Sequence, residues 1–137
     1  MPNVTVTRRL TFNAAHRVHN PALSAEENAA IFGKCNNPNW HGHNYVLEVS
    51  VSGPVDQKTG YVIDLAKVKE IVQREVIERV DHRNINLEVD FMAGVIPTTE
   101  NMAIACWRVL ENRIAPGKLH RIRLWETENH YVEYQGD

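Results

Sequence analysis

Hydrophobic and polar residues alternate at the start of the chain, which predicts a long, half-buried β-strand. One parity carries the apolar side chains Val4, Val6, Leu10 and Phe12, and the other carries Thr5, Thr7, Arg9 and Thr11. Arg8 interrupts the apolar parity. The same parity continues through Ala14 to His16, so we expect this histidine on the apolar face at the end of the strand.

A second alternating stretch begins at His41 and runs to about Ser52. Its apolar parity is Tyr45, Leu47, Val49 and Val51, against Glu48, Ser50 and Ser52 on the other face. His41 and His43 come just before Tyr45 and share the parity of the apolar residues, and Gly42 lies between them. Because side chains at i and i+2 of a strand project to the same face, both imidazoles can reach one ion.

The segment between these two strands contains a short predicted helix. Ser24 followed three residues later by Glu27 is a capping-box pattern, and Gly33 is a typical C-terminal stop. We interpret residues 21–32 as a lid-like segment that delivers Cys35.

Two longer helices are predicted in the second half. One begins at about Leu65, with Asp64 as its N-cap, and ends near Asp81-His82, because its valines recur at helical spacing. The other follows Pro97, with Thr98 or Thr99 as the cap and Glu100 in its first turn, and ends near residue 113. Cys106 falls among the apolar residues of this second helix, so we interpret it as a small core residue.

Two final strands are predicted over residues 119–127 and 130–134, joined by a tight turn. Glu126 shares the parity of Ile122 and Leu124. A carboxylate at the end of an apolar face is either a rim salt-bridge partner or a ligand anchor, and the pattern leaves both open. The order ββααββ predicts an α+β fold with a four-stranded antiparallel sheet and two helices on one face. Such a small sheet has two edges that assembly can cover.

Length and composition narrow the classes of function. The 137 residues suit one domain spanning residues 1–137, and the net charge of −2, with no basic block, argues against a nucleic-acid partner and favours a small-molecule ligand. The longest apolar runs are too short for a membrane span, and the chain begins with a strand pattern rather than a signal peptide, so we expect a cytoplasmic protein. The two cysteines are interpreted as thiols.

Three histidines at the ends of apolar strand faces are the strongest chemical signal. A single His-x-His pair is common in strands, and His16 alone would be interpreted as a core or rim histidine. Together, His16, His41 and His43 match the three-histidine ligand set of a catalytic Zn²⁺ site, which keeps one position open. With Cys35 as a fourth ligand, the same residues would instead form a closed structural zinc module.

Several segments together resemble the 6-pyruvoyl-tetrahydropterin synthase family. They are residues 12–17 (FNAAHR), 32–45 (FGKCNNPNWHGHNY), 81–82 (DH), 97–101 (PTTEN) and 126–129 (ETEN). The resemblance spans most of the chain. It implies the tunnelling fold, in which trimers form a sheet-lined barrel and two trimers stack into a homohexamer with active sites between subunits.

The resemblance also implies a site and a reaction. His16, His41 and His43 would bind Zn²⁺, and Cys35, Asp81 and His82 would form the catalytic group. Glu126 would anchor the pterin, with Thr98, Thr99 and Glu100 near it. The implied activity is that of a carbon–oxygen lyase, which converts 7,8-dihydroneopterin triphosphate to 6-pyruvoyl-tetrahydropterin with elimination of triphosphate, in tetrahydrobiopterin biosynthesis.

The spacing around Cys35 bears on the choice of product. Cys35 precedes His41 by six positions, which is similar to the pyruvoyl synthases. The related 6-carboxytetrahydropterin synthases of deazapurine biosynthesis usually have a shorter spacing, and they are the alternative on the same substrate. Trp40 departs from the small residue usual before the first histidine of the pair. Arg17 and Lys34 flank the motif, while His19, His120 and His130 lie outside it and are interpreted as surface or rim residues.

Overall fold

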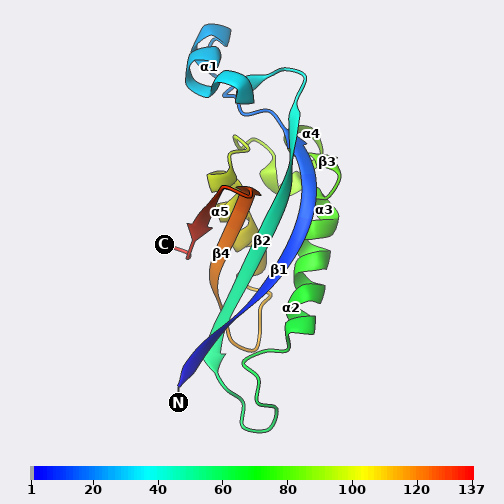
Figure 1. Cartoon of the computed structure of the whole chain (residues 1–137), viewed down its shortest axis with the longest axis vertical. Helices are drawn as coiled ribbons and strands as arrows, with labels where there is room; N and C mark the ends of the chain where they lie inside the picture. The colour runs from blue at the N-terminus through cyan, green and yellow to red at the C-terminus, as the bar shows by residue number, and fades with distance from the viewer. Residues whose placement is uncertain (1) are drawn as a thin grey trace.

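The fold is built on two long antiparallel strands, β1 (Asn3–His16) and β2 (His41–Pro54), which pair along their whole length. The computed structural model describes residues 2–137. The alternation predicted from the sequence is confirmed, because the parity of Leu10 and Phe12 in β1 and of Leu47 in β2 is buried. Figure 1 shows the two strands running side by side through the length of the molecule.

The sheet has five strands in the order β3-β1-β2-β4-β5, so the prediction of a four-stranded antiparallel sheet is wrong in two respects. β4 (Lys118–Thr127) and β5 (His130–Tyr134) are antiparallel, as predicted. The additional strand, β3 (Arg83–Asn84), pairs in parallel with Ala14 and Ala15 of β1. Two residues carry no detectable alternation, so only the approach of the chain to β1 creates this strand.

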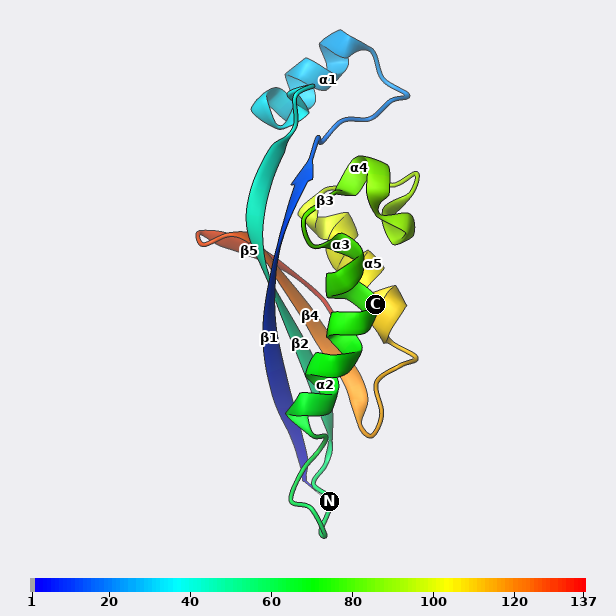
Figure 2. The same cartoon turned by 90° about the vertical axis from the view of Figure 1, so that its right-hand side faces the viewer.

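Helices cover one face of the sheet, and the other face carries none in the part of the chain described (Figure 2). One continuous helical segment consists of α2 (Leu65–Val72), the π-helical η2 (Gln73–Ile77) and α3 (Glu78–Val80). The second long helix is α5 (Thr99–Leu110). Two short elements between them, α4 (Ile85–Glu88) and η3 (Asp90–Met92), add to the two predicted helices.

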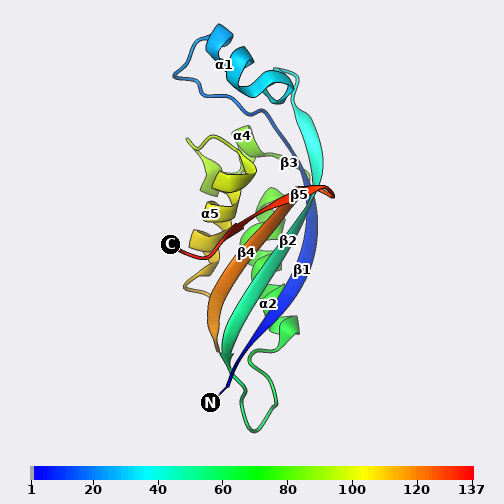
Figure 3. The same ribbon diagram turned by 60° about the vertical axis from the view of Figure 1, so that its left-hand side comes forward.

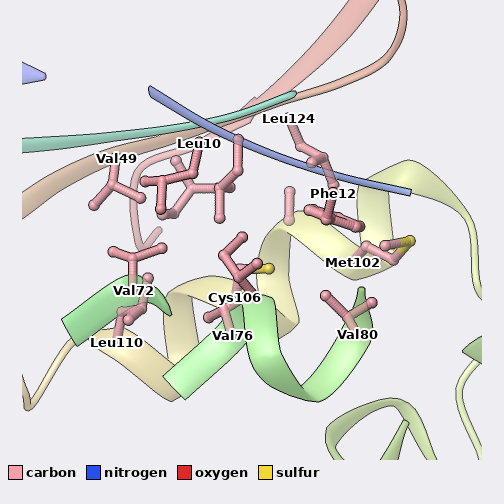
Figure 4. Close-up of a cluster of buried hydrophobic side chains, with 14 of the residues drawn as sticks. Leu10, Phe12, Val49, Val72, Val76, Val80, Met102, Cys106, Leu110 and Leu124 are labelled. Carbon is pink, nitrogen blue, oxygen red and sulfur yellow. The ribbon is translucent and has the colours of Figure 1, made fainter. Parts of the chain in front are cut away.

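The core lies between the sheet and these helices. Figure 4 shows strand side chains, such as Leu10, Phe12, Val49 and Leu124, pointing toward side chains of α2–α3 and α5, such as Val72, Val76, Met102 and Cys106. Burial of each large apolar side chain contributes about 1.5–3 kcal/mol. Cys106 is buried, as predicted, and desolvation raises its pKa to about 12, so this thiol stays protonated at neutral pH.

The lid-like segment stands away from this core. α1 (Ala25–Phe32) and the 3₁₀ turn η1 (Gly33–Asn36) lie beyond the ends of β1 and β2 (Figure 3). The predicted capping box is present, since Glu27 N–H donates to Ser24 Oγ at 3.1 Å and Ser24 N–H donates to the Glu27 carboxylate at 3.2 Å. Gly33 ends the helix at φ 55°. The predicted caps Asp64 and Thr98 also begin their helices.

No helix described in residues 2–137 combines the length and the apolar character needed to cross a membrane.

Candidate metal centre

Strand register brings the three predicted histidines together. In the β1–β2 pairing His16 lies directly opposite His41, and Ala14 lies opposite His43. The inward parity of both strands then places all three rings on the helix-covered side of the sheet. Their ligand nitrogens lie within 4.8 Å of one another, and the centroids of the His16 and His41 rings are 4.5 Å apart.

The orientation of His16 is fixed from outside the cluster. Its Nδ1 lies 2.8 Å from the carbonyl oxygen of Pro97, just before α5. A carbonyl can only accept, so Nδ1 carries the proton and Nε2 presents its lone pair to the cluster. Metal-ligating histidines usually donate their second ring N–H to such a partner. The sequence pattern contained no sign of this contact, because the carbonyl belongs to the backbone.

The unpaired nitrogens fit a metal ion. His16 Nε2, His43 Nε2 and both ring nitrogens of His41 are buried and lack a hydrogen-bond partner. A buried polar atom without a partner costs about 1–3 kcal/mol, which a cation bound between the rings would offset. Burial lowers the pKa of His16 to about 4 and lowers that of His43, so both rings are neutral at pH 7, as ligation requires.

Glu126 lies beside this cluster. Its carboxylate oxygens are 3.8 Å from His43 Nε2 and 4.0 Å from His16 Nε2. Thr99 donates its hydroxyl proton to Glu126 Oε2 at 2.6 Å. Burial raises the pKa of Glu126, but the Thr99 hydrogen bond and the neighbouring His43 hold it below its ordinary value overall, so the group is ionised.

His130 also contacts Glu126, whereas its position in the sequence indicated only a surface or rim residue. Its Nε2 lies 3.4 Å from Glu126 Oε1, although the ring is largely exposed. A β-bulge between Trp125 and Thr127 shifts the pairing of β4 with β5 and sets Thr127 opposite His130. The signal in the sequence was the i, i+4 spacing of Glu126 and His130 across a tight turn.

Asp81 and His82 form a second group at the edge of the sheet beside β1. Asp81 accepts a hydrogen bond from the backbone N–H of Asn13 at 3.0 Å, which lowers its pKa together with the neighbouring His82. Asp81 Oδ2 lies 2.9 Å from His82 Nδ1. His82 has φ 61°, in the left-handed region, and this turn folds its ring back onto the preceding carboxylate. The Nε2 of His82 therefore faces away from Asp81.

Two surface grooves connect these groups. A groove of about 530 Å³ between the ends of β2 and β4 is lined by both His43 and Glu126. A second groove, of about 460 Å³, is lined by His43 and His82. His43 thus borders both grooves, and Glu126 lines one of them and His82 the other.

Cys35 lies apart from the metal cluster. It is exposed on the turn η1 and does not belong to the group of donors within ligand distance of one another among residues 2–137. Its position argues against a closed four-ligand module. Of the other predicted pterin-site residues, Thr99 contacts Glu126, Thr98 accepts from Asn101 N–H as the cap of α5, and Glu100 is exposed in the first turn.

Fold and site together define an α+β protein with three histidines that could hold a metal ion, beside an ionised carboxylate. Comparison with known proteins agrees with this class. The family described as "6-pyruvoyl tetrahydropterin synthase" matches residues 5–137. The chain therefore belongs to the 6-pyruvoyl tetrahydropterin synthase family.

Individual relatives support that membership over nearly the full chain. The 6-pyruvoyl tetrahydrobiopterin synthase of Homo sapiens is 42% identical over 132 residues, which cover 96% of this chain and 91% of the human protein. The corresponding protein of Drosophila melanogaster is 40% identical over 136 residues, covering 98% and 81%. The solved structure of Caenorhabditis elegans 6-pyruvoyl tetrahydropterin synthase superimposes with a TM-score of 0.94 at 42% identity, covering 100% and 98%.

Proposed function

We propose that this protein is a Zn²⁺-dependent 6-pyruvoyl-tetrahydropterin synthase, a carbon–oxygen lyase acting on 7,8-dihydroneopterin triphosphate. The observation that carries the proposal is the position of His43 between two grooves, one lined by Glu126 and the other by His82. The human and Drosophila relatives named above carry the corresponding activity in their names.

Each side chain has a distinct task in the proposed reaction. Glu126 accepts two parallel hydrogen bonds from a ring N–H and the 2-amino group of the pterin, and Thr99 orients its carboxylate. His16, His41 and His43 would hold Zn²⁺, which when bound would polarise the substrate's side-chain oxygens and make the adjacent C–H protons more acidic. Cys35 acts as the base that accepts such a proton.

The Asp81–His82 pair supplies the second proton-transfer group. The 2.9 Å contact between Asp81 Oδ2 and His82 Nδ1 fixes the tautomer with the proton on Nδ1. His82 Nε2 can then relay a proton to or from the three-carbon side chain of the substrate. Net conversion moves protons along this chain and expels triphosphate, so no redox cofactor is required.

Product analysis tests the proposal. The purified, zinc-loaded protein is incubated with 7,8-dihydroneopterin triphosphate, and the pterin product and triphosphate are quantified. We expect 6-pyruvoyl-tetrahydropterin and triphosphate in equal amounts. Accumulation of 6-carboxytetrahydropterin would assign the alternative activity, and an unchanged substrate with full zinc occupancy would refute both.

We further propose a homohexamer of two stacked trimers, with Cys35 and the metal contributed by one subunit and Asp81-His82 by a neighbour. The uncovered sheet face and the projecting α1–η1 segment support assembly (Figure 2). In addition, Cys35 lines neither of the grooves that His43 borders. Within a single chain, however, His43 and His82 share a groove, so the partition of the site between subunits requires a direct test.

Complementation provides that test. Inactive Cys35→Ala and His82→Ala proteins are unfolded together in equal amounts and reassembled. If sites are shared, about a quarter of them receive both intact halves, because each half is intact with a probability of about one-half. Activity above both parents is expected. Subunit mixing confirmed by native mass spectrometry, without recovered activity, would place all three residues in one chain.

A further inference from the structure

Arg17 connects the metal-binding end of the sheet to the turn that carries Cys35. It directly follows His16, and its backbone is held on both sides by one side chain. The Arg17 N–H donates to Asn86 Oδ1 at 2.9 Å, and Asn86 Nδ2 donates to the Arg17 carbonyl at 2.9 Å. Asn86 is itself fixed in α4, because its N–H donates to the side chain of the cap residue Asn84 at 3.0 Å. The backbone of Arg17 is therefore attached firmly to the body of the protein.

The side chain of Arg17 reaches from this anchored position to the catalytic turn. Arg17 Nε donates to the carbonyl oxygen of Asn36, the residue after Cys35, at 2.8 Å. The next residue, Val18, donates its N–H to the carbonyl of Cys35, also at 2.8 Å. Two consecutive residues after His16 thus bind two consecutive carbonyls of η1. The guanidinium has no carboxylate within ion-pair distance in residues 2–137, so its role here is not that of a salt bridge.

The other contacts of the α1–η1 segment lie within the segment itself. α1 packs mainly on η1 and projects from the sheet in every view (Figures 1, 2 and 3). The buried amide of Asn28 donates to the carbonyls of Asn20, Leu23 and Ser24, and its Oδ1 accepts from Asn20 N–H. These bonds shape the lid but do not attach it to β1 or β2. The location of Cys35 relative to the histidines therefore depends strongly on residues 17 and 18.

We propose that Arg17 is a positioning residue that fixes Cys35 relative to the three histidines through its bond to the Asn36 carbonyl. This inference rests on the proposed function, in which Cys35 is the base. A charge-assisted bond to a carbonyl is stronger than a neutral one, and a displacement of about 1 Å at a reacting group can reduce the rate by roughly 10²-fold. Lysine does not reproduce the contact, because its single ammonium replaces the planar guanidinium that donates through Nε.

The test compares Arg17→Met and Arg17→Lys with a matched control, Arg113→Met. Arg113 also donates to a backbone carbonyl, that of Val109 at 3.0 Å near the end of α5, and in addition pairs with Glu75 at 3.0 Å. For each variant, zinc content, kcat, KM and amide hydrogen exchange are measured, the last for the peptides covering residues 17–20, 33–37 and α5. The exchange measurement needs no substrate, so it reports on the hydrogen bond between Arg17 and the Asn36 carbonyl even if the proposed function fails.

We expect both Arg17 variants to keep zinc and KM near wild type while kcat falls roughly ten-fold or more. Exchange at residues 17–20 and 33–37 should accelerate by roughly ten-fold or more, with α5 unchanged. Arg113→Met should leave zinc content, kcat, KM and exchange at residues 17–20 and 33–37 unchanged, with any faster exchange confined to α5. A rise in KM at constant kcat would overturn the proposal in favour of direct phosphate binding by Arg17. Unchanged exchange at residues 33–37 would show that Arg17 does not hold the turn that carries Cys35, and would overturn the proposal. Cys35→Ala with wild-type turnover would instead refute the proposed function while leaving the exchange result intact.

Discussion

The histidine cluster and the Cys35 turn lie at the same end of the molecule but are built differently. His16, His41 and His43 are positioned by the register of two long strands, and each carries buried nitrogens. Cys35 is exposed on a short turn after a projecting helix, and this turn is attached by a small number of polar contacts to Arg17 and Val18, just after β1. Sheet register is cooperative and rigid, whereas a turn held by single hydrogen bonds can be displaced at low cost.

We expect this difference to separate the proposed metal binding from the proposed catalysis. Substitutions in the strand ends should affect metal affinity and turnover together, since the ligands are part of the sheet. Substitutions in the turn should affect turnover alone, since the metal ligands do not depend on it.

Removal of a metal ligand should have the largest effect. His41→Ala leaves two histidines, so we expect metal affinity to fall by more than the roughly 10–100-fold typical of outer contacts, and activity to be lost with it. Metal analysis after gel filtration measures occupancy. His120→Ala, which alters an exposed histidine elsewhere on the sheet, serves as the control. Full zinc occupancy and turnover in His41→Ala would refute the three-histidine assignment.

Removal of the proposed base should affect turnover but not metal. Cys35→Ala is expected to keep its zinc and its thermal midpoint while kcat falls about 10²-fold or more, the usual share of general-base catalysis. Cys106→Ala is unsuitable as a control, because it opens a cavity in the core. Loss of zinc together with stability in Cys35→Ala would indicate that this thiol is a fourth ligand in a closed structural site.

The buried histidines should make the stability of the metal-free protein dependent on pH. Burial lowers the pKa of His16 from 6.5 to about 4, so between these values the unfolded chain binds a proton that the folded protein does not. The free energy of unfolding should therefore fall as pH decreases below 6.5, by up to about 1.4 kcal/mol per unit for one such group. The lowered pKa of His43 acts in the same direction.

Urea denaturation of the metal-free protein between pH 7 and 5 measures this slope. The His16→Gln variant should show a flatter dependence, because only His43 of the two shifted rings then remains. An equal slope in wild type and variant would mean that His16 is protonated in the folded state and is not held as a neutral ligand.

The smallest expected effect concerns the junction between the turn and β2. Trp40 has φ 69°, a left-handed conformation that costs a residue with a Cβ about 1–2 kcal/mol. Trp40→Gly and Trp40→Ala both remove the indole, but only glycine adopts this conformation without strain. We expect the glycine variant to be more stable than the alanine variant by about 1 kcal/mol, opposite to the usual order. Thermal denaturation of both variants measures the difference, and a more stable alanine variant would contradict it.

The sequence by itself determined the long strands, the helix caps and the residue types of the histidine cluster. Alternation through Val6, Leu10 and Phe12 to His16 was sufficient, because a strand has a fixed period of two. The Ser24–Glu27 capping box and the caps Asp64 and Thr98 were equally visible, since they depend on local hydrogen bonds. The motifs around Cys35 and His41 pointed to the family through residue identities at fixed spacing.

Tertiary structure decided how these pieces meet. The register that sets His16 opposite His41, the Pro97 carbonyl that orients His16, and the bulge that brings His130 to Glu126 join segments far apart in sequence or involve the backbone alone. β3 exists only because residues 83–84 approach β1, and the left-handed His82 turns its ring onto Asp81. Neither feature leaves a periodic signal, because hydrophobic patterning records which face is buried and not which distant atoms come into contact.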